Sequence, residues 1–599
     1  MKPVAAIRNF GRGIGAVLAL AFKAAPARTL GLLTNQTLLG SMTIVGGYAT
    51  KALIQAATHH DQARAAAAGA VIALVAGVAV IASLITGQLT RRVSELFTTH
   101  LDGELIRLTT AIATLDYQDR PIYADKIALI RSSRQLLAAS IQAVVINLQL
   151  AVIMVGTLVV LVGIDPVFVL LPLFATPRFL ADRRQQRLAK AALEASAEPQ
   201  RLRTHLYNTA ASPVAGKELR VFGLGEEMLR RHRAITETLR RMAREASQRA
   251  VFWSMTGSLA FTTGCVLAIG WVVLRGARGE VSLGNVVLAA TLTTTVSTLM
   301  TTTLQMGQYL ENTLQTVERY LWLVDFSAKS ADRASPSAKP PQRLQKGMTV
   351  EGLSFSYPDR DRPALSDITL DLPAGKVIAL VGENGSGKST LVKLLCGLYR
   401  PSQGRILIDG ADLADMAAAD WRARISAAFQ DFTNFELPLH ESVGVGDLAR
   451  LGERDQALAA MAGAGAGDIA ELSPEGLEVM LGRKWGGVEL SGGQWQKLAL
   501  ARAIVRDQPL LVVFDEPAAA LDATAEHDLF ERFAAQARSR AARGQVTLLV
   551  SHRFSTVRMA DLIAVLDKGR VIEFGSHETL LARAGLYAEL FEMQARAYR

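Results

Sequence analysis

Six long segments with at most one charged residue each constrain the fold of this chain more than any other feature. Segment 69–90, GAVIALVAGVAVIASLITGQLT, carries no charge at all, and about 20 apolar residues are enough for a helix to cross a bilayer. Because the hydrocarbon core holds no water for backbone N–H and C=O groups, a single spanning segment must be helical. We therefore predict an all-α transmembrane domain with six spans over residues 1–325. The other spans are 29–52, 137–162, 166–180, 251–274 and 283–308.

The composition agrees with a membrane domain joined to a domain that faces water. Hydrophobic residues make up 50% of the chain, charged residues only 20%, and the net charge is +10. A positive charge can indicate nucleic-acid binding, or Lys and Arg in loops that face anionic lipid. The sequence shows no basic stripe with interleaved aromatic residues, which is what a nucleic-acid surface would need. We therefore expect the lipid bilayer as a partner and no nucleic acid.

The distribution of Lys and Arg predicts the orientation of the spans. These residues gather before the first span and in loops 91–134 and 181–250, whereas the turn at 163–165 has none. The positive-inside rule places the basic segments in the cytoplasm, although Arg275 and Arg278, in the short loop before the sixth span, run against it. We expect a multi-pass membrane protein whose six spans return the chain to the cytoplasm.

A second domain is predicted after a linker. Residues 326–347 are rich in Ser, Ala, Pro and Lys without an apolar period, as linkers are. Beyond it, apolar runs of strand length alternate with helical patterns, as in Val377–Val381, Leu510–Phe514 and Val546–Val550. Such alternation is typical of a parallel sheet covered by helices. Residues 348–599 are therefore predicted to form an α/β domain.

One motif in this domain is a phosphate-binding loop. It follows the strand that ends at Val381 and opens a helix, which is the context the motif requires. Its glycines let backbone N–H groups point at phosphate, and the helix N-terminus adds partial positive charge. Lys388 is placed to reach the β- and γ-phosphates, and Ser389 to ligate Mg²⁺. The predicted cradle consists of Gly382, Glu383, Asn384, Gly385, Ser386, Gly387, Lys388, Ser389 and Thr390.

Two carboxylates follow a predicted buried strand. Asp515 and Glu516 come directly after Leu510–Phe514. Asp515 suits a Mg²⁺ contact, often through water, and Glu516 is placed to orient or deprotonate an attacking water. Acidic residues at a strand end are common, so this pair alone is a weak signal. Its position after the phosphate loop in the chain strengthens the prediction of a catalytic role.

A second anion cradle lies at Leu490–Gln494, where Ser491 and two glycines open another helix. One nucleotide does not need two phosphate cradles in one domain. The simplest resolution is that this cradle serves the nucleotide of another copy. The sequence therefore predicts a head-to-tail dimer with two shared sites.

In this order, Gly382–Ser389, Leu490–Gln494, Asp515-Glu516 and His552 resemble the ATPase domain of ABC transporters, over about residues 350–595. The resemblance implies ATP and Mg²⁺ as cofactors. It also implies a role for each matching residue. Tyr357 would stack on adenine, Gln430 would sense Mg²⁺, His552 would contact the γ-phosphate, Ser491, Gly493 and Gln494 would bind the partner's γ-phosphate, and Asp522 would lie in the loop that connects the two sites. Two of these residues have ordinary alternatives, because Tyr357 could be a packing aromatic and His552 a structural histidine.

The membrane half is similar in layout to the six-span exporters of the same family. The long loops are read as helical continuations of the spans that end in short transverse helices near 113–117 and 216–222, the second of which resembles an intracellular contact segment of these exporters. Segment 481–497 resembles bacterial exporters of modified peptides such as lanthipeptides, which implies the bacterial inner membrane as the location, with the ATPase domain in the cytoplasm. This likeness sits in the ATPase rather than in the substrate path.

The sixth span is rich in threonine. Its threonines share one helical stripe by the 3.6-residue period. The stripe is either a polar wall of a translocation cavity or a surface for tight helix packing. Charged residues are nearly absent from the spans, which favours a bulky amphipathic cargo over a small ion. The stripe consists of Thr291, Thr294, Thr295, Thr298, Thr301 and Thr302.

The expected function is that of an ATP-driven exporter subunit, an ATPase coupled to transport. The cargo would be a peptide, a lipid or a drug-like molecule, carried by alternating access. The partner would be a second half-transporter, either an identical chain or a related one. The alternative is an ATP-gated channel or a regulator of another membrane protein, which would use the same motifs without moving cargo.

Overall fold

The computed structural model divides into two compact units. The first comprises Met1–Glu104 and Ser132–Tyr320, and the second Leu105–Arg131 and Leu321–Arg599. The structure describes all residues except 1–2, 121–122, 124–125, 128, 131–135, 138, 213–214, 333–337, 359–361, 518–530, 533–534, 536–540, 552 and 598–599.

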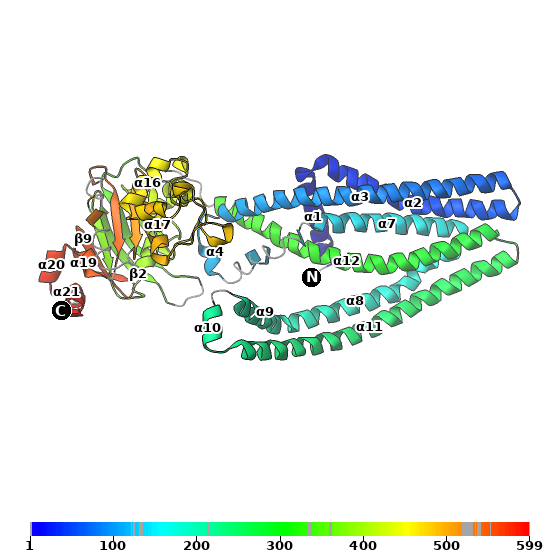
Figure 1. Cartoon of the computed structure of the whole chain (residues 1–599). Helices are drawn as coiled ribbons and strands as arrows, with labels where there is room; N and C mark the ends of the chain where they lie inside the picture. Colours follow the sequence, from blue (N-terminus) through cyan, green and yellow to red (C-terminus); the bar gives the residue numbers. More distant parts are fainter. Residues whose placement is uncertain are drawn as a thin grey trace. The chain divides into compact units, whose positions relative to one another are not determined.

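The described part of the first unit is helical (Figure 1). Its long helices pair side by side, α2 with α7 and α8 with α11. The sequence of α7 carries no charged residue and is apolar on nearly all sides, as expected of a helix surrounded by hydrocarbon. The helices are α1 (Pro3–Ala24), α2 (Pro26–Thr58), α3 (Gln62–Thr110), α7 (Ser140–Ile164), α8 (Leu171–Ala195), α9 (Ala197–Ala211), α10 (Gly216–Val221), α11 (Gly225–Ala277) and α12 (Leu283–Asp332), with a 3-10 turn, η1 (Pro166–Leu170), between α7 and α8.

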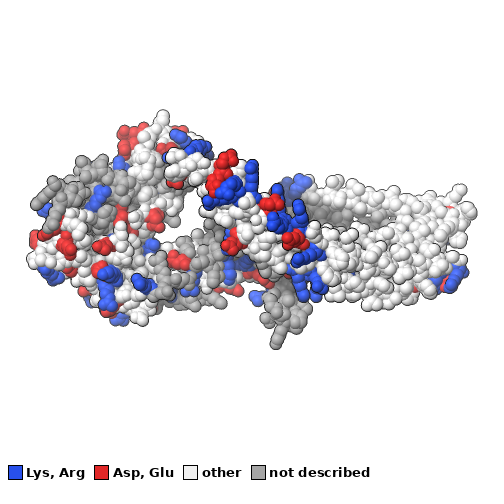
Figure 2. Space-filling model, turned by 90° about the horizontal axis from the view of Figure 1, so that it is seen from below, with Lys and Arg blue, Asp and Glu red and all other residues white. Residues whose placement is uncertain are grey.

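Four of the described helices, α3, α7, α11 and α12, are long and apolar enough to cross a membrane. Helices α2 and α8 cover the other two predicted spans, so the count of six stays a prediction. Large apolar side chains are exposed on helices α3 and α7, among them Leu74, Leu84 and Val159. Figure 2 shows the same surface almost without charged side chains over most of its length. A continuous apolar surface of this size fits lipid rather than water.

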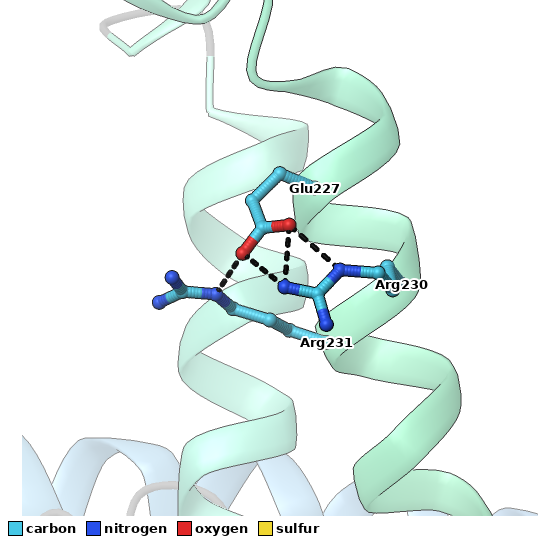
Figure 3. A network of polar contacts seen from close by, with 3 residues as sticks. All are labelled: Glu227, Arg230 and Arg231. Atoms are coloured by element: carbon cyan, nitrogen blue, oxygen red, sulfur yellow. Dashed lines mark hydrogen bonds and ion pairs between the residues drawn. The ribbon is translucent and has the colours of Figure 1, made fainter.

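Charged residues begin where the helices leave this apolar zone. At the start of α11, Arg230 donates to both Glu227 carboxylate oxygens at 2.8 and 2.7 Å, and the Arg231 Nε donates to one of them at 2.6 Å (Figure 3). The hydrogen bonds from Arg230 and Arg231 lower the pKa of Glu227, and the one from Arg230 has the larger effect. An acidic residue in the first turn and pairs three and four residues apart both stabilise a helix end. Loop 181–250 thus continues the spans as helix, with the short α10 at its tip as predicted.

Among its described residues, the second unit has two sheets. The central one has six strands in the order β10-β9-β3-β8-β7-β6, parallel except for the antiparallel pair β9 and β10. Strands β7 and β8 are buried along their whole length, which explains their continuous apolar sequences. The other sheet is antiparallel, in the order β2-β1-β4-β5. The strands are β1 (Gly347–Phe355), β2 (Leu365–Pro373), β3 (Val377–Val381), β4 (Gln403–Ile408), β5 (Ala411–Asp412), β6 (Ile425–Ala428), β7 (Leu511–Asp515), β8 (Val546–Val550), β9 (Leu562–Asp567) and β10 (Arg570–Gly575).

Helices pack around these sheets and complete the α/β domain that the sequence predicts. This confirms the predicted fold class of a helical membrane domain followed by an α/β domain with a phosphate loop. The helices of the second unit are α4 (Asp116–Asp119), α13 (Lys388–Leu395), α14 (Ala418–Arg422), α15 (Leu439–Gly444), α16 (Arg454–Gly463), α17 (Gly492–Ile504), α19 (Phe554–Val557), α20 (His577–Ala582) and α21 (Leu586–Ala597).

The segment between the two predicted domains is more ordered than its composition suggests. Helix α12 continues to Asp332, so the first part of the expected linker 326–347 is helical, and β1 begins at Gly347. Segment Leu105–Arg131, which lies within the first predicted domain, packs with the ATPase-like unit. The predicted boundaries 1–325 and 348–599 therefore stay a prediction about sequence domains rather than a description of the compact units.

Candidate functional site

The phosphate loop connects β3 to α13 and depends on glycine. Gly382, Gly385 and Gly387 have φ angles of +152°, +85° and +106°, in a region that favours glycine. A Cβ on Gly382 would lie 2.1 Å from the Leu566 carbonyl oxygen. Only glycine therefore allows the loop to lie this close to the strand beside it.

Lys388 is the first residue of α13 and is buried. Its Nζ donates to the carbonyl oxygens of Gly382 at 2.8 Å and Glu383 at 2.9 Å. Burial lowers the pKa of Lys388, while the nearby carboxylates of Glu516 and Asp515 act in the opposite direction. An ammonium group held in a partly dry site with only carbonyl partners is suited to receive an anionic ligand.

Asp515 ends β7 and faces Ser389 across the site, with 3.5 Å between the Ser389 Oγ and the Asp515 Oδ1. The carboxylate is buried, and burial raises the pKa of Asp515, while the Ser389 hydrogen bond opposes this shift. A buried carboxylate with a hydroxyl beside it provides the hard oxygen ligands that Mg²⁺ prefers. The Ser386 hydroxyl is also buried and has no hydrogen-bond partner among the described residues. These groups fit a metal–phosphate ligand.

Glu516 follows in a turn with φ +50°, where its backbone N–H donates to the Val550 carbonyl oxygen at 3.0 Å. This bond fixes the start of the turn, so the side chain leaves the sheet toward the cavity. The Gln430 Nε2 donates to a Glu516 carboxylate oxygen at 2.9 Å. Strands β6 and β7 are neighbours in the sheet, which explains how residues far apart in sequence meet.

A cavity of roughly 1280 Å³ is lined by residues of the phosphate loop, Gln430 and Glu516. Tyr357 lies on its wall, and its hydroxyl is 3.2 Å from the Thr390 Oγ1. Sequence reasoning missed several further lining residues, including Arg362 and three residues of the C-terminal helix α21, Leu590, Met593 and Gln594. No short motif marks such residues, because tertiary packing alone brings them to the cavity. The predicted residues on the wall are Tyr357, Gly382, Glu383, Asn384, Gly385, Gly387, Lys388, Ser389, Thr390, Gln430 and Glu516.

The second anion cradle stands apart from this cavity. Ser491 caps α17, since its Oγ accepts from the Gln494 backbone N–H at 3.3 Å while the Gln494 Oε1 accepts from the Ser491 N–H at 2.9 Å. Ser491 is exposed and Gly493 partly so. None of the described residues that line the cavity comes from Leu490–Gln494. Within one copy, the structure does not bring the two predicted cradles together.

Two predicted site residues, His552 and Asp522, lie outside the residues that the structure describes. Their roles therefore stay predictions.

The threonine stripe on α12 is open in the single chain. Thr291, Thr294 and Thr298 are exposed, and their hydroxyls donate to backbone carbonyls within the helix at 2.7–3.2 Å. Each hydroxyl thus keeps its acceptor lone pairs for a ligand, water or another helix. The neighbouring Thr293 is buried on the opposite side.

Comparisons with known proteins agree with these features. A family model described as "ABC transporter" matches residues 365–519. An "ATP-dependent lipid A-core flippase" of Xanthomonas oryzae pv. oryzae is 31% identical over 437 residues, which cover 72% of this chain and 70% of the relative. A flippase of the same name from Chromohalobacter salexigens is 40% identical over 254 residues, 42% of each chain, so the chain spans less than half of that relative.

Among solved structures, the fold is similar to that of a bacterial Atm1-family ABC exporter with ATP bound. The TM-score is 0.74, the sequence identity is 24%, and the match covers 95% of this chain and 98% of the other. This similarity extends over both units and concerns the fold.

Two glycines of the phosphate loop offer a matched test of its geometry. A Cβ on Gly387 would lie 2.6 Å from the Leu365 Cδ2 and 2.9 Å from the Ala364 carbonyl oxygen, whereas one on Gly385 would meet nothing within 4 Å. Both positions have positive φ and share the strain of a side chain there. We predict that Gly387→Ala destabilises the protein by about 1–3 kcal/mol more than Gly385→Ala. Thermal unfolding of the full chain in detergent, without nucleotide, measures this, and equal midpoints would contradict it.

Proposed function

Because the chain belongs to the ABC transporter family, we propose that it is one half of an ATP-driven exporter that moves an amphipathic, lipid-like cargo out of the cytoplasm. One observation carries the proposal. A single cavity is lined by the phosphate loop, the buried Lys388 and the Glu516 carboxylate, with Asp515 beside Ser389 of the loop, and the second anion cradle does not line it. A chain built this way hydrolyses ATP only when another copy completes the site.

ATP occupies the cavity with its phosphates in the loop that begins at Gly382. Lys388 binds the β- and γ-phosphates and neutralises charge that develops as the γ-phosphoryl group leaves. Ser389, Asp515 and Gln430 would hold Mg²⁺, and the bound ion would draw charge from the phosphate oxygens. Glu516 accepts a hydrogen bond from the attacking water and takes its proton. Gln430 supports Glu516 through the 2.9 Å hydrogen bond.

The second copy contributes Ser491, Gly493 and Gln494 to the γ-phosphate of this copy's ATP. Two ATP molecules then hold two ATPase units together, and hydrolysis releases them. This cycle opens the membrane helices to one side and then to the other, since the two states differ in their contacts. This chain has both the phosphate loop with its carboxylates and the second anion cradle, so an identical chain suffices as the partner. A related chain with the same cradle would serve equally.

The cargo proposal rests on the membrane helices and the relatives. The membrane helices have an exposed apolar surface, and α12 adds exposed hydroxyl groups. Together they offer an amphipathic cargo both apolar and polar contacts. The relatives are named lipid A-core flippases, and a glycolipid combines acyl chains with a polar head in this way. Among the peptide, lipid and drug-like cargoes considered, we therefore favour a lipid. The likeness of segment 481–497 to peptide exporters lies in the ATPase unit and does not bear on the cargo.

We predict that Glu516→Gln keeps ATP binding but slows hydrolysis by about 100-fold or more, because the amide cannot take the proton of water. The measurement is phosphate release by the full protein in lipid nanodiscs, beside binding of a fluorescent ATP analogue. The control is Glu351→Gln. It changes an exposed carboxylate of β1 that forms an ion pair with Arg405 of β4. Undiminished hydrolysis by the Glu516 variant would remove Glu516 as the base.

The hydroxyl stripe gives a second prediction. We predict that Thr294→Val with Thr298→Val raises the lipid concentration for half-maximal ATPase stimulation by roughly threefold to tenfold, because ligand hydrogen bonds are lost. The readout is ATPase activity in phosphatidylglycerol vesicles with increasing fractions of a lipid A-core glycolipid. Thr293→Val, on the buried side of α12, is the control. The same stimulation curve for the double variant and the unchanged protein would exclude the stripe from the cargo path.

A further inference from the structure

A segment that precedes the third span is bonded directly to the ATPase fold within the second unit. The Leu115 backbone N–H donates to the Leu398 carbonyl oxygen at 2.9 Å. The guanidinium of Arg422 donates both to the Ala113 carbonyl oxygen and, at 2.8 Å, to the Gly397 carbonyl oxygen. These bonds join segment 113–119 to the turn after α13, the helix that begins in the phosphate loop.

Tyr399 connects this segment to the interior. Its ring is buried, with 4% of the residue exposed. Its hydroxyl donates to the Asp119 carboxylate at 2.5 Å. A short hydrogen bond from a phenol to a carboxylate is of the strong, charge-assisted kind. Tyr399 is therefore bonded to a residue, Asp119, that lies outside the ATPase domain predicted from the sequence, residues 348–599.

The other side of Tyr399 touches Tyr357, the residue on the cavity wall. The two rings meet edge to face, with centroids 5.5 Å apart and planes at 82°. Phe355 packs against both, at 5.0 Å from Tyr357 and 5.3 Å from Tyr399. Edge-to-face pairs have preferred geometries and so transmit orientation between rings. Beyond the ring, the Tyr357 hydroxyl meets Thr390 of α13.

We propose that Asp119 and Tyr399 are positioning residues for Tyr357, so that segment 113–119 sets how well the cavity holds the base of ATP. The proposal rests on the proposed stacking of Tyr357 on adenine. It makes Asp119, Tyr399 and Tyr357 one chain of contacts from a segment next to a membrane span to the nucleotide base. By reciprocity of coupled binding, a bound base would in turn favour the docked position of the segment. This route is separate from the contact between Gln430 and Glu516 at the phosphate end.

Two single substitutions break the chain at its outer bond. Tyr399→Phe keeps the ring and removes the hydroxyl, and Asp119→Ala removes the acceptor. We expect each to raise the KM for ATP by about 3- to 10-fold with little change in kcat, because base stacking is weakened while the phosphate end is untouched. The double variant should match either single variant, since both remove the same bond. The measurement is the ATPase activity of the full chain in lipid nanodiscs over a range of ATP concentrations.

Inhibition by inorganic tripolyphosphate separates positioning from general damage. This probe has phosphates without a base, so its inhibition constant should be the same in the variants and the unchanged protein. A merely structural role of Tyr399 would move the KM for ATP and the tripolyphosphate constant together. That result, or an unchanged KM in both variants, would overturn the proposal. Asp507→Ala, which removes a surface carboxylate 2.8 Å from Arg450, is the matched control and should leave the KM for ATP unchanged.

A third substitution separates this proposal from the one on which it rests. Tyr357→Leu should itself raise the KM for ATP, and Tyr399→Phe should add nothing in that background. If Tyr357→Leu leaves the KM unchanged, the stacking role of Tyr357 fails and the positioning role falls with it. If Tyr357→Leu raises the KM but the Tyr399 and Asp119 variants do not, only the positioning role is overturned.

Discussion

The burial of Lys388 among backbone carbonyls and beside two carboxylates is the interaction on which the rest of the site depends. Burial alone would favour a neutral amine, and Asp515 and Glu516 oppose that shift. Within the described residues, the ammonium group has carboxylates nearby, but its hydrogen bonds go to the backbone carbonyl oxygens of Gly382 and Glu383. Such a balance is poised for a polyphosphate, which supplies the missing anionic oxygens. The glycines around Lys388 exist to let the backbone close on that ligand.

The two units meet opposite physical demands. The helices of the first unit expose apolar side chains such as Leu84 and satisfy their backbone internally, which suits hydrocarbon. The second unit buries continuous apolar strands such as β7 and places its charges at their carboxyl ends, where α/β folds bind ligands. Segment 113–119 matters because it belongs to the second unit by packing and precedes a membrane span by sequence.

Much of the fold and of the site could be predicted from the sequence. Strands β3 and β8 have the predicted bounds, and β7 begins one residue later, at Leu511. Their apolar runs are continuous because they are buried on both faces. Lys388, Asp515, Glu516 and Gln430 line up because strand ends meet at one edge of a parallel sheet. The walls formed by Met593 and the contact of Asp119 with Tyr399 could not be predicted, since they depend on packing between distant segments that carry no local pattern.

The central claim is that each ATP site is completed by a second copy, and one measurement tests it most directly. A chain with Lys388→Ala and a chain with Ser491→Arg are each expected to be inactive alone. Their mixed dimer, isolated through two different affinity tags, would contain one doubly altered site and one site with intact Lys388 and intact Ser491. We predict that this mixed dimer hydrolyses ATP clearly faster than either variant paired with itself. If the mixed dimer hydrolysed ATP no faster than the inactive variants, the two copies would not share their ATP sites.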